Sequence, residues 1–371
     1  MASRSFLRAL STTFSLRTQS ATVTFPSGGL VLITVSSRSS TTLATLPPTP
    51  ILNQARTLLT MPSPPTIAVI APGAMGAAVA SRFTKAGCTV LTTLEGRSPS
   101  TVDRAKKAGM EDASLGDIAR RADWVLSIIP PSSATAFAEA FKKAYETSGG
   151  NPKLAFADCN AVSPDTVKSI ARIFDGSPIR FVDASIIGGP PTDGYDPAFY
   201  ASAAPEDEDA LDAFVGLSAW GLRTIALKGE GAGVGDASGL KMAYAGISKG
   251  FIGLTATMIL AANASSPATA QALMHELHAS QPFILERITR SIPSMLPKAY
   301  RWVGEMEEIS AFVRSGLGDG EAHVHEGFAH LYDRVEKALP EGEDVAVLKR
   351  FVEGAKATIH ESGGSKSHKP Q

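Results

Sequence analysis

The sequence predicts an α/β domain with a doubly wound parallel sheet over residues 63–228, followed by an all-α domain over residues 229–360. Three observations support this prediction. A continuous apolar run from Thr66 to Ile70 is typical of a strand covered on both faces, and a glycine-containing turn and a helix follow it. Short β-branched runs then alternate with helical stretches. Beyond about Lys228 the strand signals stop and only helical patterns remain.

Each strand expected in the first domain is a short apolar or β-branched run that ends near turn residues. These runs lie at residues 66–70, 89–94, 124–129, 154–157 and 180–184. Helical patterns lie between them at residues 77–86, 105–108, 115–121 and 164–174. In the second domain we expect helices at residues 238–262, 267–291, 298–314, 320–338 and 344–359.

The first helix of the second domain is long and apolar. Along it, large side chains recur at helical spacing: Leu240, Tyr244, Ile247, Phe251 and Leu254. The most apolar stretch, Phe251 to Ala262, is shorter than the roughly 20 residues that a membrane-spanning helix needs. We therefore interpret it as a buried helix and expect no membrane span.

The first 62 residues differ from the rest of the chain in charge. No Asp or Glu precedes Glu95, and the only charged side chains before residue 61 are five arginines among many Ser and Thr. This composition resembles a mitochondrial presequence. The alternative is an upstream start codon assigned in error, with translation of a cytoplasmic protein from Met61. The expected location is therefore the mitochondrial matrix or the cytoplasm. We exclude residues 1–62 from the fold and expect a polar, disordered tail at residues 361–371.

Composition argues against several classes of function. With 44% hydrophobic and 19% charged residues, the chain is typical of a globular protein. A net charge of −1 gives no reason to expect nucleic acid as a partner. Cys88 and Cys159 form no motif of a metal site or a disulfide scaffold. His323 and His325 are too loosely spaced to predict a metal site.

The turn after the first strand reads Ala71-Pro72-Gly73-Ala74-Met75-Gly76. The dinucleotide-binding fingerprint, GxGxxG between a strand and a helix, lets backbone N–H groups reach a pyrophosphate at the helix N-terminus. Here Ala71 replaces the first glycine, and Gly73 and Gly76 occupy the other two positions. The turn predicts a Rossmann domain whose cofactor contacts are Gly73, Ala74, Met75 and Gly76. An ordinary glycine-rich turn is the alternative.

The second strand ends near Glu95, Arg97 and Ser98, where the cofactor's ribose is expected. Glu95 could accept the ribose 2′-OH of NAD. Arg97 and Ser98 could instead hold the 2′-phosphate of NADP, because a guanidinium matches a phosphate bidentately. We favour NADP, with NAD as the alternative. Ile129 and Pro130, where the third strand ends, are also expected to face the cofactor.

Three further stretches follow in order: Asp158 to Pro164, Asp183 to Gly189, and Gly235 with Lys241 six residues later. Together with the glycine-rich turn, they resemble the β-hydroxyacid dehydrogenase family, which includes 3-hydroxyisobutyrate and 6-phosphogluconate dehydrogenases. The likeness runs from about Thr66 to Phe312. It is greatest to a subgroup with a C-terminal domain like that of phosphogluconate dehydrogenase.

The resemblance implies that Lys241 is the catalytic acid/base, and burial on an apolar helix would lower its pKa toward neutrality. It also implies that Asn160, Gly188 and Gly189 bind the substrate, and Tyr244 is a further candidate beside Lys241. The chain departs from the family at three places. Ile187 stands where a serine is usual, Ala245 where an asparagine is usual, and Glu307 with Glu308 where a lysine faces the active site. Arg301 could compensate for that lysine.

The resulting hypothesis is hydride transfer between nicotinamide and the CH–OH group of a small 3-hydroxy acid or related aldonate, with Lys241 handling the proton. An imine reductase-like enzyme and a non-catalytic NADP-binding or interaction module are the alternatives. The expected partners are a small carboxylic acid substrate and further copies of the chain. A homodimer or higher oligomer would form through the helical domain.

Overall fold

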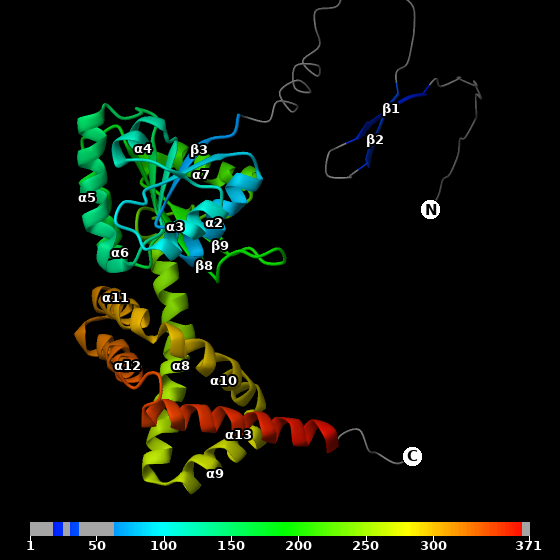
Figure 1. Cartoon of the computed structure of the whole chain (residues 1–371), viewed down its shortest axis with the longest axis vertical. Helices are drawn as coiled ribbons and strands as arrows, with labels where there is room; N and C mark the ends of the chain where they lie inside the picture. The colour runs from blue at the N-terminus through cyan, green and yellow to red at the C-terminus, as the bar shows by residue number, and fades with distance from the viewer. Residues whose placement is uncertain (1–17, 25–29, 37–62, 366–371) are drawn as a thin grey trace, which may run out of the picture. The chain divides into compact units, whose positions relative to one another are not determined.

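The computed structural model describes residues 18–24, 30–36 and 63–365 (Figure 1). Strands β1 (Thr18–Thr24) and β2 (Leu30–Ser36) pair antiparallel within a unit that ends at Pro62, separate from the unit that begins at Ser63. Sequence analysis did not foresee this hairpin. The rest of the predicted leader lies outside the described residues.

The α/β domain is built on one eight-stranded sheet with the order β10-β9-β8-β7-β6-β3-β4-β5. The strands are β3 (Thr66–Ile70), β4 (Thr89–Thr92), β5 (Glu111–Asp112), β6 (Trp124–Ser127), β7 (Ala155–Asp158), β8 (Arg180–Ile187), β9 (Ala198–Ser202) and β10 (Arg223–Ala226). Strands β3 to β8 run parallel, whereas β9 pairs antiparallel with β8. The strand order reverses between β3 and β6, which places a ligand-binding crevice at their carboxyl ends.

Helices cover both faces of this sheet, as predicted. They are α2 (Ala74–Lys85), α3 (Pro99–Lys107), α4 (Leu115–Arg121), α5 (Pro131–Ser148), α6 (Pro164–Ile173) and α7 (Glu208–Val215). Alternate residues of β3 enter two separate cores. Ile67 packs with Phe83 of α2 and Phe214 of α7, and Ile70 packs on the other face with Phe141 of α5. Neither α5 nor α7 was predicted from the sequence. Helix α5 begins at Pro131, because proline is favoured at the first helical position.

The second domain is all-α, again as predicted. Its helices are α8 (Asp236–Ser265), α9 (Pro267–Ser280), α10 (Pro282–Met295), α11 (Ala299–Leu317), α12 (Asp319–Lys337) and α13 (Glu343–Ser365). The single helix expected at residues 267–291 is two helices separated at Gln281, before Pro282. Helix α13 continues to Ser365, so the tail prediction is wrong for residues 361–365. Residues 366–371 lie outside the described part of the chain.

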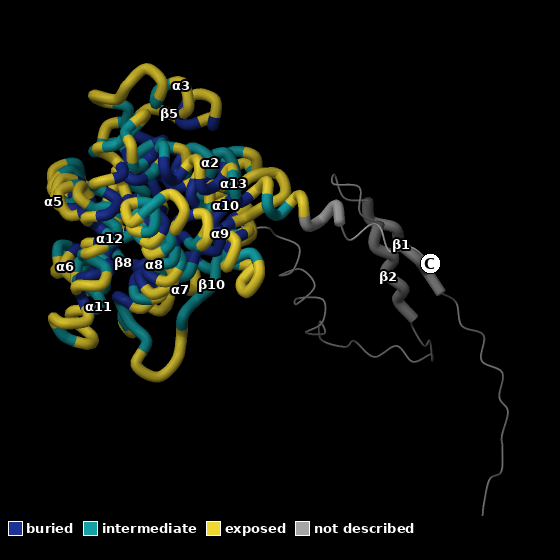
Figure 2. The backbone as a smooth tube through the Cα atoms, turned by 90° about the horizontal axis from the view of Figure 1, so that it is seen from below, coloured by how far each residue is buried: buried dark blue, intermediate teal, exposed yellow. Residues whose placement is uncertain are grey.

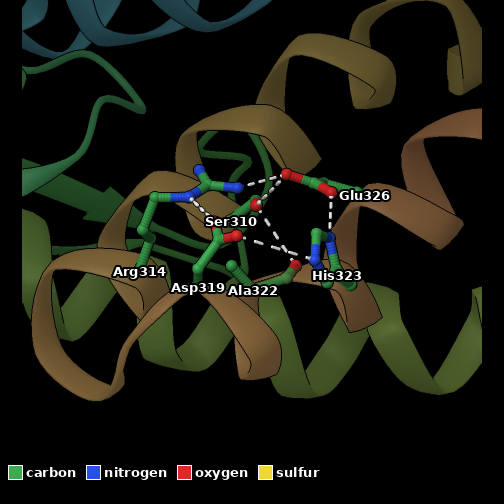
Figure 3. Close-up of polar contacts among 6 residues, drawn as sticks. All are labelled: Ser310, Arg314, Asp319, Ala322, His323 and Glu326. Atoms are coloured by element: carbon green, nitrogen blue, oxygen red, sulfur yellow. Dashed lines mark hydrogen bonds and ion pairs between the residues drawn. The ribbon is translucent and has the colours of Figure 1, made fainter.

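The turn between α11 and α12 is joined by a surface network of charged side chains (Figure 3). Arg314 Nε donates to Asp319 Oδ1 at 2.7 Å, and Arg314 also pairs with Glu326. His323 Nδ1 lies 2.6 Å from Glu326 Oε2, which raises the pKa of His323. Because these groups are exposed, we assign them to the helix–helix turn rather than to a ligand site. No cluster of metal-ligating side chains occurs in the described residues.

Helix α8 is buried on one face only, which corrects its interpretation as a buried helix. Figure 2 colours each described residue of the chain by its burial. Its buried face carries mostly small side chains, and Gly253 lies against Phe328 of α12. Most of the predicted apolar stripe is exposed, from 36% at Leu240 to 76% at Ile247. By length and composition alone α8 could cross a membrane. Its 18-residue apolar window has a mean hydropathy of 1.4, and 33% of this window is buried. The same test is passed by core helices, and α8 packs along β8, α11, α12 and α13.

Candidate active site

The glycine-rich turn leaves the N-terminus of α2 open. Gly73 is the N-cap residue, no side chain caps the helix, and the first turn carries no acidic residue. A Cβ added at Gly73 would meet no atom within 4 Å, whereas one at Gly76 would overlap the carbonyl oxygen of Ala71. Gly73 therefore leaves room for a phosphate, and Gly76 lets the helix pack closely on the strand.

Ala71 adopts a left-handed backbone conformation, with φ of +64°. It occupies the first glycine position of the fingerprint, where the tight turn demands this conformation. The substitution noted in the sequence thus leaves the turn geometry intact and adds steric strain at a residue with a Cβ.

The expected ribose site lies at the N-terminus of α3. Glu95 and Arg97 are exposed, and neither side chain has a partner among the described residues. Ser98 is the N-cap residue of α3. Arg104 of α3, which sequence analysis missed, donates from Nε to the carbonyl oxygen of Pro72 at 3.1 Å and so ties α3 to the glycine-rich turn.

Asn160 joins the carboxyl ends of β6 and β7. Its Oδ1 accepts from the backbone N–H of Ile129 at 2.7 Å, and its Nδ2 donates to Ser127 Oγ at 3.0 Å and to Asp158 Oδ2 at 2.9 Å. The side chain is only 3% exposed. Substrate contact by Asn160 stays a prediction: both Nδ2 hydrogens are already donated, whereas Oδ1 accepts one bond and has a second lone pair. Ile129 and the exposed Pro130 lie at the end of β6, beside the crevice.

Lys241 is held against β8. Its ammonium donates to the carbonyl oxygen of Ile186, two residues before Gly188. Burial, followed by the positive charge of Arg301, lowers the pKa of Lys241 to about 8. A lysine with this pKa is partly neutral near physiological pH and can exchange a proton with a substrate.

The start of α8 is fixed by Asp183 of the same strand. Asp183 Oδ2 accepts from the backbone N–H groups of Gly235 and Ser238, each at 3.0 Å, and Oδ1 accepts from Ser238 Oγ at 2.8 Å. One strand therefore holds both the first turn of α8 and the ammonium of its lysine. No local sequence motif predicts that Asp183 anchors the first turn of α8, because its hydrogen-bond partners lie more than 50 residues away.

Asp158 and Asp183 are register partners on neighbouring strands, and both are fully buried. Burial raises the pKa of Asp158 to about 7, with a further contribution from the charge of Asp183. Burial likewise raises the pKa of Asp183 to about 6, against the opposing effect of its hydrogen bonds. Two buried carboxyl groups with raised pKa values thus lie side by side on β7 and β8.

The loop after β8 brings in a tyrosine that sequence analysis missed. Gly188 has a φ of +132°, and a Cβ there would overlap the hydroxyl of Tyr195. Tyr195 therefore packs directly on the backbone predicted to bind a carboxylate. Arg82 of α2 pairs with Asp196 at 2.8 Å, which ties this loop to the cofactor helix.

A second lysine of α8 faces the start of α11. Lys249 forms an ion pair with Glu305, and these side chains are 16% and 13% exposed. The Lys249 ammonium also lies 5.3 Å from the centre of the Trp302 ring. Arg301 Nε lies 3.9 Å from Glu305 Oε1.

The remaining candidates lie toward the edges of the site. Glu308 accepts from the backbone N–H of Ser163 at 2.6 Å and from Thr166 Oγ1 at 3.0 Å, so it caps α6 and docks α11 on the α/β domain. Glu307 is exposed. Tyr244 is 55% exposed on the apolar stripe of α8, and its contact with a substrate stays a prediction.

An open helix N-terminus at the switch point of a Rossmann sheet, with a lysine of lowered pKa on α8 of the second domain, is typical of nicotinamide-dinucleotide-dependent dehydrogenases. Residues 66–217 match the family model described as the NAD binding domain of 6-phosphogluconate dehydrogenase. Residues 264–335 match a domain of unknown function, DUF1932. These matches support the β-hydroxyacid dehydrogenase family, and the first shows an NAD(P)-binding domain. The predicted fold and cofactor class are confirmed.

Individual relatives are distant. The mitochondrial 3-hydroxyisobutyrate dehydrogenase of Drosophila melanogaster is 29% identical over 136 residues, which are 37% of this chain and 41% of that protein. An uncharacterized protein of Methanothermus fervidus is 34% identical over 109 residues, 29% of this chain and 40% of the relative. The matches thus span about two fifths of the curated relatives' length.

Two of the similar solved structures share the fold over about three quarters of this chain. A conserved protein of unknown function, described as structurally similar to 3-hydroxyacid dehydrogenases, is 25% identical with a TM-score of 0.55, covering 75% of this chain and 99% of that one. The 3-hydroxyisobutyrate dehydrogenase of Mycobacterium tuberculosis is 15% identical with a TM-score of 0.55, covering 77% and 98%.

Proposed function

We propose that this chain is an NAD(P)-dependent dehydrogenase or reductase that acts on the CH–OH group of a small 3-hydroxy acid or related aldonate. The observation that supports this most is the position of Lys241. Its ammonium lies on the Ile186 carbonyl, next to the Gly188-Gly189 backbone and above the carboxyl ends of β7 and β8. When bound, the nicotinamide accepts the hydride during oxidation and supplies it during reduction.

Lys241 handles the proton. During oxidation its neutral amine accepts the hydroxyl proton as the hydride leaves the carbinol carbon, and during reduction its ammonium returns that proton to the carbonyl oxygen. With a pKa of about 8, roughly a tenth of Lys241 is neutral at pH 7. Oxidation should therefore accelerate as the pH rises through 8, and reduction should be favoured below it.

We propose NADP as the preferred cofactor. Arg97 is exposed, has no side-chain partner among the described residues, and lies next to the N-terminus of α3. A 2′-phosphate there would meet a guanidinium and a helix N-terminus together. Glu95, two residues earlier, supports the NAD alternative because it could accept the ribose 2′-OH.

We also propose that two copies pair through the helical domain. The stripe on α8 exposes Leu240, Tyr244, Ile247, Leu254 and Met258 along one side of the helix. A continuous exposed apolar face of this kind is typical of a protein–protein contact. For location, the arginine-rich leader supports import into the mitochondrial matrix, with translation from Met61 as the cytoplasmic alternative. Sequencing the mature N-terminus distinguishes them.

The test is a panel of 3-hydroxy acids, aldonates and semialdehydes, each with NADP(H) and NAD(H), followed by nicotinamide absorbance. Lys241→Ala should lower turnover by at least about a hundredfold and leave cofactor affinity nearly unchanged. Lys356→Ala, on the exposed face of α13, is the matched control. Cofactor binding without turnover of any panel member would favour a non-catalytic module. Cyclic imines are assayed beside the panel, and turnover of the imines without turnover of any panel member would favour imine reduction.

A further inference from the structure

We propose that the hydroxyl of Tyr195 donates a hydrogen bond to the carboxylate of the substrate, and that Arg82 holds the tyrosine in that position. The proposal rests on the proposed function, because it concerns the acid bound at the Gly188-Gly189 backbone. It adds a residue that selects acids over neutral compounds, and a positioning residue on the cofactor helix α2.

The first argument is the contact between Tyr195 and Gly188. A Cβ added at Gly188 would overlap the Tyr195 hydroxyl oxygen and lie 3.1 Å from the ring carbon that carries it. Gly188 also has a φ of +132°, which residues with a Cβ rarely adopt. The glycine therefore permits two things at once: the turn of the backbone and the close approach of a phenol hydroxyl to that backbone.

The hydroxyl of Tyr195 is available to a ligand. The residue is 46% exposed, and its hydroxyl has no hydrogen-bond partner within residues 63–365. A phenol hydroxyl can donate one hydrogen bond, and a donor is what a carboxylate needs. A bond from a neutral donor to a carboxylate is stronger than one to a neutral acceptor. Tyr195 can therefore favour an acid over an uncharged analogue of the same shape.

The backbone that carries Tyr195 is held on both sides of the residue. Thr192 N donates to Tyr195 O at 2.8 Å, and Tyr195 N donates to Thr192 O at 3.1 Å. These bonds close a two-residue hairpin around Asp193-Gly194, a preferred sequence for such a turn. Arg82 of α2 donates to the Thr192 carbonyl oxygen and pairs with Asp196 at 2.8 Å. The tyrosine is thus positioned before a substrate binds, which reduces the entropy lost on binding.

Tyr195 and Lys241 lie close enough for one small molecule to contact both. The Lys241 ammonium donates to the carbonyl oxygen of Ile186, two residues before Gly188. Standard backbone dimensions therefore put the ammonium and the Tyr195 hydroxyl within roughly 13 Å of each other. A 3-hydroxy acid separates its carboxylate carbon from its carbinol carbon by two carbon–carbon bonds. With a hydrogen bond of about 2.8 Å at each end, its hydroxyl can face Lys241 while its carboxylate faces Tyr195.

The test measures binding by calorimetry to the NADPH-bound protein, because the reduced cofactor cannot oxidise the acid. The probes are 3-hydroxybutanoate and its neutral amide, 3-hydroxybutanamide. Tyr195→Phe keeps the ring on Gly188 and removes only the hydroxyl. In this variant the dissociation constant of the acid should rise roughly tenfold, and that of the amide less than about threefold. Tyr300→Phe, at a tyrosine that is 62% exposed on α11, is the matched control and should change neither.

Further variants test the positioning role of Arg82. Arg82→Gln should weaken binding of the acid about threefold in the wild-type background and less in the Tyr195→Phe background, because its effect acts through the tyrosine. Arg82→Lys should retain part of the affinity. Lys85→Gln is the matched control, since Lys85 reaches Asp193 of the same loop through an exposed pair and should leave the affinity unchanged. Equal effects of Arg82→Gln in both backgrounds would overturn its positioning role.

Three results would overturn the contact with Tyr195: unchanged affinity of Tyr195→Phe for the acid, equal losses for acid and amide, or no binding of the acid to the wild type. Turnover is measured separately, so that the two hypotheses fail separately. Acid binding that requires the Tyr195 hydroxyl, without turnover of any panel member, supports this inference and removes the dehydrogenase assignment. Turnover of hydroxy acids by Tyr195→Phe at the wild-type KM does the reverse.

Discussion

Replacing Asp183 with asparagine tests whether a buried carboxylate holds the first turn of α8. Asp183→Asn keeps the size of the side chain but removes the charge and one acceptor. The carboxylate now accepts from Gly235 N, Ser238 N and Ser238 Oγ. An amide nitrogen would face some of these donors instead, so the first turn of α8 would lose part of its anchor on β8.

The magnitude follows from the raised pKa. Asp183 rises from 3.8 to about 6, and a shift of about two pKa units corresponds to about 3 kcal/mol. Because the folded state binds this proton more tightly, the contribution is fully present below pH 4 and is lost as the pH rises to about 6. The hydrogen bonds lost in Asp183→Asn contribute about 1–3 kcal/mol. Near pH 8 the ionised wild type has lost its own contribution of about 3 kcal/mol, so the two proteins should have nearly equal free energies of unfolding.

The assay is denaturant unfolding of both proteins between pH 4 and 8. The wild-type free energy of unfolding should fall by about 2 kcal/mol more than that of Asp183→Asn between pH 4 and 6. Turnover at pH 8 should fall about tenfold with cofactor affinity unchanged, since Lys241 loses its fixed position. Equal pH slopes would show that Asp183 does not titrate there, and unchanged turnover would refute its positioning role.

Three other changes have defined outcomes. Ala71→Gly should raise the free energy of unfolding by about 0.5–1 kcal/mol, because φ of +64° strains a residue with a Cβ; a lower melting temperature would contradict this. Arg97→Ala should weaken NADP binding roughly tenfold and leave NAD unchanged, as titration calorimetry would measure; equal weakening would transfer the selectivity to Glu95. Ile247→Glu should yield a folded monomer by light scattering, since Ile247 is 76% exposed in a single chain; a monomeric wild type would refute the proposed contact.

The fold was predictable because local patterns determine most of it. The central strands are continuous apolar runs, and β3 was located from Thr66 to Ile70 without error. Strands β5, β9 and β10 were missed. Strand β9 runs antiparallel between β8 and the edge strand β10, after a loop that no strand–helix alternation marks. The spacing along α8 identified which residues share a face. The spacing does not show which face of α8 is buried, because that depends on where α11, α12 and α13 pack against the helix.

The candidate site was predictable only where its residues lie close together in sequence. The glycine-rich turn and Lys241 belong to short motifs, so the sequence alone could propose them as site residues. Arg104, Tyr195 and Glu305 act on groups between 7 and 56 residues away, so only the folded chain identifies them. Asn160 was identified by its place in a motif, but its hydrogen bonds, which link β6 to β7, could not be foreseen.

Helix α8 combines these constraints in one element. Asp183 holds its first turn, the Ile186 carbonyl holds Lys241, and Glu305 holds Lys249 two turns later. The exposed stripe that includes Ile247 runs along the same helix. A second copy packed on that stripe would therefore contact α8, the helix that carries Lys241. If Ile247→Glu gives a folded monomer with lowered turnover and intact cofactor affinity, pairing supports catalysis through α8. If the monomer keeps full turnover, the contacts with β8 and α11 are sufficient to position Lys241.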